Sequence, residues 1–366
     1  MANVIKFAGI VVLGLAALTV VGGSMAGDFL APRGGVYASA DRGGVWQRWG
    51  QVEGANINRL DIAAIVHNPK DPRILYMGTM GDAVLKSVDS GATWHRLEDQ
   101  NKVLDRRANV YSIAVDYTLP DYARKKPDRF YLGVYQNDFG RVLRTEDGGV
   151  TFKEVYVTTR PQYAVFVVVL DPREPNTVWA GTAEGLLLRS RDSGETWKLV
   201  QEFPGVINAV IINPKNTDQI LVSTFANGVF TSADGGASWT DETEGLSGFP
   251  RAGSVEAVLL DASTTPATLY LGSAFGLIKS ANWGVDWQAV SAVFADEVLP
   301  VLSVAASPRN SREIYVGANR HIYRTLNGGE TWQVRQLATS KKVRALWVDP
   351  RDPNRVLAGL GKAGRR

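Results

Sequence analysis

One eight-residue frame recurs seven times along this chain of 366 residues and constrains its fold more than any other feature. We call the frame the box. In each box a serine or threonine is followed by an aspartate or asparagine two positions later, a glycine four positions later and a tryptophan or phenylalanine seven positions later. Repeats that return every roughly 40 to 50 residues are typical of propellers and arrays. The seven boxes begin at Ser39, Ser87, Thr145, Ser190, Ser232, Ser280 and Thr325.

Each repeat contains enough sequence for four strands. Continuous apolar runs such as residues 164–170 and 206–212 predict inner strands that are covered on both faces, and the proline and asparagine that follow them predict a turn. The second strand ends in a glycine, the third runs into the box, and the fourth leaves from the box aromatic. The box glycines permit the positive φ of a tight hairpin. The glycines that end second strands are Gly78, Gly133, Gly181, Gly272 and Gly317.

The two ends of the repeat region complement each other. The last unit, residues 343–359, stops before any box, whereas the first box at Ser39 has no inner strands before it. We therefore expect residues 35–49 to complete the blade that residues 343–359 begin, which leaves only short protected edges. The prediction is an all-β, seven-bladed β-propeller with four-stranded blades, closed by N- and C-terminal segments sharing one blade and preceded by an N-terminal hydrophobic helix.

The acid or amide of each box is predicted to be structural. Its side chain can accept hydrogen bonds from amides of its own turn, with the serine or threonine hydroxyl in support. Calcium binding is the alternative, but one acid per box is too few ligands. His67, His95 and His321 occupy unrelated offsets without metal-ligand spacing. We expect no metal, no cofactor and no catalytic residue of a Ser-His-Asp kind. The predicted structural residues are Asp41, Asp89, Asp147, Asp192, Asp234, Asn282 and Asn327.

The N-terminus predicts export. Residues 7–21 form an apolar stretch behind Lys6, and residues 24–26 form a small-x-small pattern suited to signal peptidase. The stretch also approaches the length of a membrane span, so a cleaved signal and a retained anchor both remain open. We predict residues 1–26 as signal peptide or anchor, 27–33 as linker and 34–366 as propeller, on the periplasmic or another extracytoplasmic face of a membrane.

Composition excludes several function classes. The chain has no cysteine, which excludes disulfides, zinc-thiolate sites and a cysteine nucleophile. Its formal charge of +3 is too small to indicate a nucleic-acid partner.

From about Gly34 to Gly361 the repeats resemble the Asp-box, or bacterial neuraminidase repeat, propellers. The resemblance implies the fold but no single function, because the same box occurs in sialidases, xyloglucanases, sortilin-type receptors and photosystem II assembly factors. In those families the box hairpins lie opposite the active or binding mouth.

The chain departs from the catalytic members of that group. The Phe/Tyr-Arg-Ile-Pro motif of sialidases is absent, and the nearest sequence, Phe249-Pro-Arg251, has the wrong order. Xyloglucanases have similar Asp-Pro turns, but they place two acids in a cleft between two propellers. The chain is most similar to single propellers of the photosystem II assembly-factor type. That resemblance implies an exported, non-catalytic protein that holds membrane-protein partners.

Two sets of loops are expected at the mouth, namely those that enter the inner strands and those between second and third strands. A basic rim there would bind carboxylates of a partner, although solvated side chains are the alternative. The predicted rim residues are Arg59, Arg106, Arg107, Arg160, Arg251, Lys341, Lys342 and Arg344. For glycoside hydrolysis, which needs paired acids, the candidates at the entering loops are Asp61, Glu256 and Glu297, with Trp179 and Phe275 as aromatics near the mouth.

Two further features are predicted away from the mouth. A proline-bounded insertion at residues 117–129 carries Arg124, Lys125 and Lys126, which could contact a partner or lipid headgroups or remain solvated. Trp283 stands at a box tip, where it would serve an interface or pack against a neighbouring loop.

Two functions follow as hypotheses. The first is a non-catalytic, exported or membrane-tethered scaffold, assembly factor or accessory subunit of a membrane protein complex. The alternative is a secreted glycan-binding or glycoside-hydrolase-like propeller.

Overall fold

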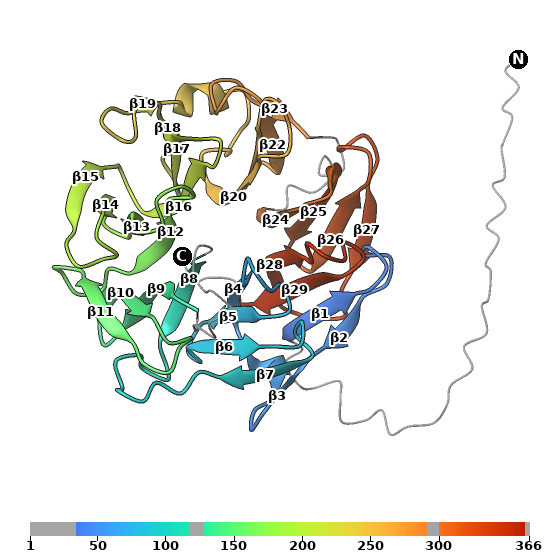
Figure 1. Cartoon of the computed structure of the whole chain (residues 1–366). Helices are drawn as coiled ribbons and strands as arrows, with labels where there is room; N and C mark the ends of the chain where they lie inside the picture. The colour runs from blue at the N-terminus through green and yellow to red at the C-terminus, as the bar shows by residue number, and fades with distance from the viewer. Residues whose placement is uncertain (1–33, 117–127, 291–299, 363–366) are drawn as a thin grey trace, which may run out of the picture. The chain divides into compact units, whose positions relative to one another are not determined.

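The computed structural model describes residues 34–116, 128–290 and 300–362, which form a seven-bladed β-propeller (Figure 1). Six sheets contain four strands, and the seventh contains five. The predicted fold class is confirmed. The predicted N-terminal helix and residues 124–126 lie outside the described residues. No helix in the described part of the chain is long and apolar enough to cross a membrane.

We number the blades along the chain and give their strands from the axis of the ring outwards. Blade 1 contains β4 (Ile62–His67), β5 (Leu75–Thr79), β6 (Val84–Ser87) and β7 (Thr93–Arg96). Blade 2 contains β8 (Asn109–Val115), β9 (Phe130–Gln136), β10 (Phe139–Thr145) and β11 (Lys153–Val157). Blade 3 contains β12 (Val165–Leu170), β13 (Val178–Thr182), β14 (Leu186–Ser190) and β15 (Lys198–Glu202).

The remaining blades follow the same order. Blade 4 contains β16 (Ile207–Asn213), β17 (Asn216–Thr224), β18 (Val229–Ser232) and β19 (Thr240–Asp241). Blade 5 contains β20 (Val255–Asp261), β21 (Thr268–Ser273), β22 (Leu277–Ser280) and β23 (Gln288–Ala289). Blade 6 contains β24 (Val301–Ser307), β25 (Asn310–Ala318), β26 (His321–Thr325) and β27 (Gln333–Gln336). Two short 3₁₀ helices, η1 (Ile57–Arg59) and η3 (Thr243–Leu246), lie in loops.

Blade 7 is built from both ends of the propeller. It contains β28 (Lys342–Val348) and β29 (Val356–Gly361) inside, and β1 (Gly35–Ser39) and β2 (Gln47–Trp49) outside. The predicted closure is confirmed: Gly35 pairs with Leu360 and Ser39 with Val356. One strand was not predicted. β3 (Gln51–Val52) runs parallel to β7 and adds a fifth strand to blade 1, so the segment from β1 to β3 joins two blades.

The boxes share one hydrogen-bond pattern, seen at the box of blade 1. The Ser87 hydroxyl donates to Asp89 Oδ1 at 2.8 Å and accepts the Gly91 amide at 2.8 Å. The Thr93 amide donates to Asp89 Oδ1 at 2.8 Å, and the Trp94 indole donates to the Gly91 carbonyl at 3.0 Å. The same hydroxyl-to-oxygen bond recurs in all seven boxes. The box side chains are therefore engaged within their own hairpins.

The second-strand glycines are required by the packing of adjacent blades. A Cβ at Gly181 would lie 2.5 Å from Ile207 Cγ2, and one at Gly272 would lie 2.5 Å from Val301 Cγ1. In each case the clashing side chain begins the inner strand of the next blade. A close-packed interior cannot absorb such an overlap without a shift of strands, so these glycines set the distance between blades.

Candidate functional site at the mouth

Every inner strand contains one β-bulge near its start, at the mouth of the propeller. In all seven blades, the pairing between the inner strand and the second strand leaves out one residue of the inner strand, at the same position. A bulge re-aims a side chain and is common beside functional sites. We call these seven residues the bulge ring. In order of blade they are Ala63, Tyr111, Phe166, Asn208, Glu256, Leu302 and Arg344.

Aromatic side chains form a continuous arc at this level over blades 2 to 4. The ring centroids of Tyr111 and Phe166 are 4.5 Å apart, and that of Phe225 lies 5.8 Å from Phe166. Burial raises the pKa of the Tyr111 hydroxyl. A second pair, Phe249 and Phe275, lies 5.3 Å apart in blade 5. The position of Phe275 in the β21–β22 loop agrees with its predicted place at the mouth.

Basic side chains gather where blade 7 meets blade 1, and we call Arg59, Lys341, Lys342, Arg344 and Lys362 the basic cluster. Asp61 Oδ1 accepts the Lys362 amide at 2.8 Å. A Cβ at Gly361 would lie 2.6 Å from Asp61 Oδ1 and 2.9 Å from Arg344 Cγ. Lys341, Arg344 and Lys362 thus lie beside one acid, and Arg59 and Lys342 adjoin them in the sequence. Within the described residues, the side chains of Arg59, Lys342, Arg344 and Lys362 make no ion pair, so their charge is available to a ligand.

Lys341 was predicted on the rim, and that prediction is wrong. Its side chain is buried, and its Nζ donates to the Leu60 carbonyl at 2.9 Å across the seam between blades 7 and 1. Burial lowers the pKa of this ammonium, whereas Asp61 opposes that effect. Lys341 therefore holds the seam together from a buried position.

The other predicted rim residues spread around the ring. Arg106 and Arg107 are exposed on the loop that enters blade 2, and Arg106 pairs with Glu98 at 3.2 Å. Arg160 lies 3.8 Å from Glu184 on blade 3, while Arg251 is exposed before blade 5 at a φ of 65°. Arg106 and Arg107 extend the basic cluster into blade 2, but Arg160 and Arg251 stand apart from it.

The candidate acids are not brought together in the described structure. Asp61 belongs to the basic cluster beside blade 1, whereas Glu256 is the bulge residue of blade 5, on strand β20 rather than on the entering loop as predicted. Arg344 likewise lies on β28 and not on a loop. Glu297 lies outside the described residues. Of the other mouth acids, Asp82 pairs with Arg96 at 2.8 Å and Glu184 with Arg160. No group of three acids or histidines in the described ranges is arranged to hold a metal ion.

Two tryptophans were singled out in the sequence, and only Trp179 lies elsewhere than expected. Trp283 is half-buried and packs against the core cluster of blades 4 and 5. Trp179 was expected near the mouth, but it is buried at the box face, where β13 leaves its turn. Trp179 begins its second strand, whereas the loops expected at the mouth follow the end of that strand, so the expectation disagreed with the predicted loop positions.

The bulge ring and the aromatic arc were missed by sequence reasoning. The seven bulge residues share no chemistry, so no pattern marks them directly. An indirect signal exists: each follows a buried isoleucine or valine at the start of an inner strand. These aliphatic residues are Ile62, Val110, Val165, Ile207, Val255, Val301 and Val343.

No family model matches the chain. Among curated proteins, the xyloglucanase Xgh74A of Acetivibrio thermocellus is 25% identical over 264 residues, which cover 60% of this chain and 30% of the xyloglucanase. A probable oligoxyloglucan-reducing end-specific xyloglucanase of Neosartorya fischeri is 26% identical over 205 residues, or 49% of this chain and 23% of the relative. The chain spans less than a third of the length of these relatives.

Solved structures of two kinds share the fold. The GH74 xyloglucanase from Xanthomonas campestris superposes with a TM-score of 0.65 at 20% identity, covering 83% of this chain and 51% of the enzyme. YCF48 from Cyanidioschyzon merolae gives a TM-score of 0.61 at 15% identity, covering 82% of this chain and 95% of YCF48. A structure of YCF48 bound to D1 peptide gives a TM-score of 0.60 at 15% identity, covering 82% and 93%. These similarities establish a common propeller fold.

Proposed function

We propose that the chain is a non-catalytic, exported or membrane-tethered propeller that binds a protein partner at its mouth, as a scaffold, assembly factor or accessory subunit of a membrane protein complex. The observation that carries the proposal is the basic cluster. Its five cations outnumber its one acid, Asp61, which gives a formal charge of +4, and all of them except the buried Lys341 are free to meet a partner. Guanidinium and ammonium groups in such a concentration attract carboxylates and accelerate the encounter with an acidic partner.

The aromatic arc supplies the second half of the same surface. Tyr111 and Phe166 stand on blades 2 and 3, and Arg106 and Arg107 lie on the loop that enters blade 2, so the same part of the ring carries apolar and basic groups. Aromatic and arginine side chains dominate the binding energy of protein interfaces. The fitting partner is a protein segment with acidic and apolar side chains close together. The structure of YCF48 bound to D1 peptide supports this choice, because a propeller of similar extent is there seen with a peptide ligand.

A pulldown from detergent-solubilised membranes of the native host tests the proposal. The full-length tagged chain is compared with an Arg59→Ala/Arg344→Ala variant. The control is Arg48→Ala/Lys198→Ala, which removes two exposed cations from the outer strands β2 and β15. We expect the mouth variant to recover at least tenfold less partner, since a single lost charge-assisted contact of about 1.5 kcal/mol already lowers the affinity about tenfold. Equal recovery by the mouth variant, or a chain isolated without any partner, would contradict the proposal.

A glycan-active propeller is the second candidate, and the sequence matches to xyloglucanases favour it. Incubation of the purified chain with xyloglucan, followed by a reducing-end assay, distinguishes a glycan-active enzyme from a non-catalytic scaffold. Hydrolysis that disappears in Asp61→Asn or Glu256→Gln would establish an enzyme and replace the scaffold proposal. Thermal unfolding of both variants controls for loss of fold.

A further inference from the structure

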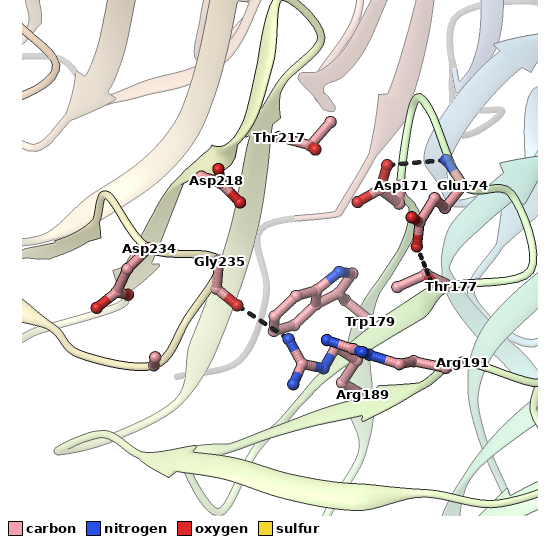
Figure 2. Close-up of a pocket in the computed structure, with 11 residues that line it drawn as sticks. Asp171, Glu174, Thr177, Trp179, Arg189, Arg191, Thr217, Asp218, Asp234 and Gly235 are labelled. Atoms are coloured by element: carbon pink, nitrogen blue, oxygen red, sulfur yellow. Dashed lines mark hydrogen bonds between the residues drawn. The ribbon is translucent and has the colours of Figure 1, made fainter.

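We propose that a pocket between blades 3 and 4, on the box face and away from the mouth, binds a pyranose unit of a glycan. The pocket has a volume of about 300 Å³. Figure 2 shows its two sides: the β12–β13 turn with Asp171, Glu174 and Thr177 on blade 3, and Thr217, Asp218 and the box around Gly235 on blade 4. Small-molecule pockets begin at about this size. The inference does not depend on the partner proposed for the mouth.

Trp179 distinguishes this seam from the other seams. Four other blades have tyrosine at the equivalent second-strand position, namely Tyr76, Tyr131, Tyr270 and Tyr315. Two of these hydroxyls reach the box of the next blade: Tyr131 donates to the Ser193 carbonyl at 3.2 Å, and Tyr315 donates to the Arg42 carbonyl at 3.0 Å. Arg144 and Arg324 donate to the same two carbonyls beside these tyrosines, whereas at the pocket Arg189 alone makes this contact, donating to the Gly235 carbonyl at 2.9 Å, because Trp179 has no hydroxyl.

The indole N–H of Trp179 is consequently left over. The side chain is 2% exposed, and its Nε1 has no acceptor among the described residues. Figure 2 shows this nitrogen turned towards the side of the pocket where Thr217 and Asp171 lie. A buried donor without an acceptor is unfavourable, and a ligand oxygen that reached this nitrogen would satisfy it.

The walls offer both donors and acceptors to such a ligand. Asp218 is exposed and its carboxylate has no hydrogen-bond partner in the described structure. Glu174 accepts the Thr177 hydroxyl through Oε2 at 3.3 Å, which leaves Oε1. The exposed Arg191 contributes a guanidinium. Asp234 is already used by its own box, where hydrogen bonds led by that from Ser238 lower the pKa of its carboxyl to about 2.

This mixture selects the chemical class of the ligand. An anion would meet the carboxylates of Asp218 and Glu174, and a cation would meet Arg189 and Arg191 without satisfying the indole N–H. Hydroxyl groups both donate and accept hydrogen bonds, so a ring that carries several of them can bond to the donors and to the acceptors of the pocket at the same time. Arg189 lies over the indole at 4.9 Å and covers one of its faces. The sugar therefore meets the nitrogen-bearing edge of Trp179.

Ligand-observed NMR on the full chain tests the inference, with methyl β-glucopyranoside, methyl β-galactopyranoside and methyl α-xylopyranoside as probes. We expect saturable binding of at least one glycoside below about 50 mM. Asp218→Ala and Arg191→Ala should each weaken it about tenfold, and Trp179→Phe about fivefold. Glu330→Ala, an exposed acid on the blade 6 box, is the matched control and should leave affinity unchanged. Thermal unfolding of Trp179→Phe shows whether the fold is kept.

Three outcomes would overturn the inference: no saturation with any probe, binding that survives in Asp218→Ala and Arg191→Ala, or binding that is lost in the Arg59→Ala/Arg344→Ala mouth variant instead. The last result would place the sugar at the mouth. If no glycoside binds at this pocket, the result of the pulldown that tests the mouth is unchanged, so each proposal can be rejected without the other.

Discussion

The indole nitrogen of Trp347, on β28, donates a hydrogen bond to His67 Nδ1, on β4, at 3.0 Å. This bond joins blade 7 to blade 1 and requires that His67 Nδ1 carry no proton. Burial lowers the pKa of His67, and the nearby Asp349 offsets that effect only in part. The closing seam of the ring thus depends on a neutral histidine.

We predict that stability falls as the pH drops below about 6.5, the ordinary pKa of histidine. The unfolded chain then takes up a proton at this position that folded His67 resists, which favours unfolding. Urea unfolding at about pH 8 and pH 5 measures the loss, and His67→Gln should reduce it. His95→Gln is the control, because exposed His95 pairs with Glu53 and lies away from the seam. An equal loss in His67→Gln would contradict the prediction.

Gly272→Ala should destabilise the propeller by about 2 kcal/mol, because the new Cβ would lie 2.5 Å from Val301 Cγ1 and 3.0 Å from the Val301 carbonyl. Gly248→Ala provides the comparison: its Cβ would have no atom within 4 Å, so its effect should stay within about 0.5 kcal/mol. Chemical denaturation of the two variants measures both values. Equal stabilities would show that blade spacing does not depend on this glycine.

At the blade 2 box, Asp147→Asn should be tolerated while Asp147→Ala costs about 1 kcal/mol. Asp147 Oδ1 accepts the Val150 and Thr151 amides, both at 2.9 Å. The Asn327 box shows how an amide replaces the acid, since its Oδ1 accepts the Thr331 amide at 3.0 Å and its Nδ2 donates to the Thr331 hydroxyl at 2.9 Å. Thermal unfolding ranks the variants. A larger loss in Asp147→Asn than in Asp147→Ala would refute a purely structural box.

Binding of the mouth partner should weaken as salt rises from about 50 to 300 mM, because exposed charges are screened beyond a Debye length of roughly 10 Å. The dependence of the affinity on salt concentration should become weaker in Arg59→Ala/Arg344→Ala and stay unchanged in Arg48→Ala/Lys198→Ala. Surface-immobilised chain and the purified partner provide the measurement. A salt-independent affinity in the wild type would remove the basic cluster from the interface.

Phe166→Leu should weaken the same partner about fivefold, since an aromatic contact is worth about 1 kcal/mol beyond its area. Phe166 is the middle ring of the arc, between Tyr111 and Phe225. Phe203→Leu instead removes a ring that is 4% exposed and packs against Phe230 inside the blade, so it controls for lost stability. If both variants bound alike, the arc would have no part in recognition.

Much of the fold follows from the sequence because its signals are local. The box repeats within eight residues and makes its hydrogen bonds within its own hairpin, so counting boxes counts blades. The closure is also visible, because a unit without a box at one end matches a box without inner strands at the other. β3 could not be predicted in this way, since its two residues have no apolar pattern and pair in parallel with a strand from another repeat.

The site was harder to predict because it arises between repeats. Arg344 was expected at the mouth, but its approach to Lys362 and Asp61 depends on how blades 7 and 1 join. The burial of Lys341 has the same origin, because its acceptor, the Leu60 carbonyl, is distant in sequence. Sequence periodicity locates a residue within its blade and says nothing about the partner across the seam.

The first strands pair with two different blades, β1 with blade 7 and β3 with blade 1, and this affects how the chain folds while it is being synthesised. β1 pairs with β29, which is synthesised after every other strand of the propeller, so Gly35 cannot pair with Leu360 until then. β3 finds Thr93 and Trp94 much sooner, while most blades are still unmade. This early pairing keeps the still unpaired edge of β1 beside blade 1, where β28 and β29 later complete blade 7. It also shortens the search that closes the ring, because loop-closure entropy grows with the length of free chain.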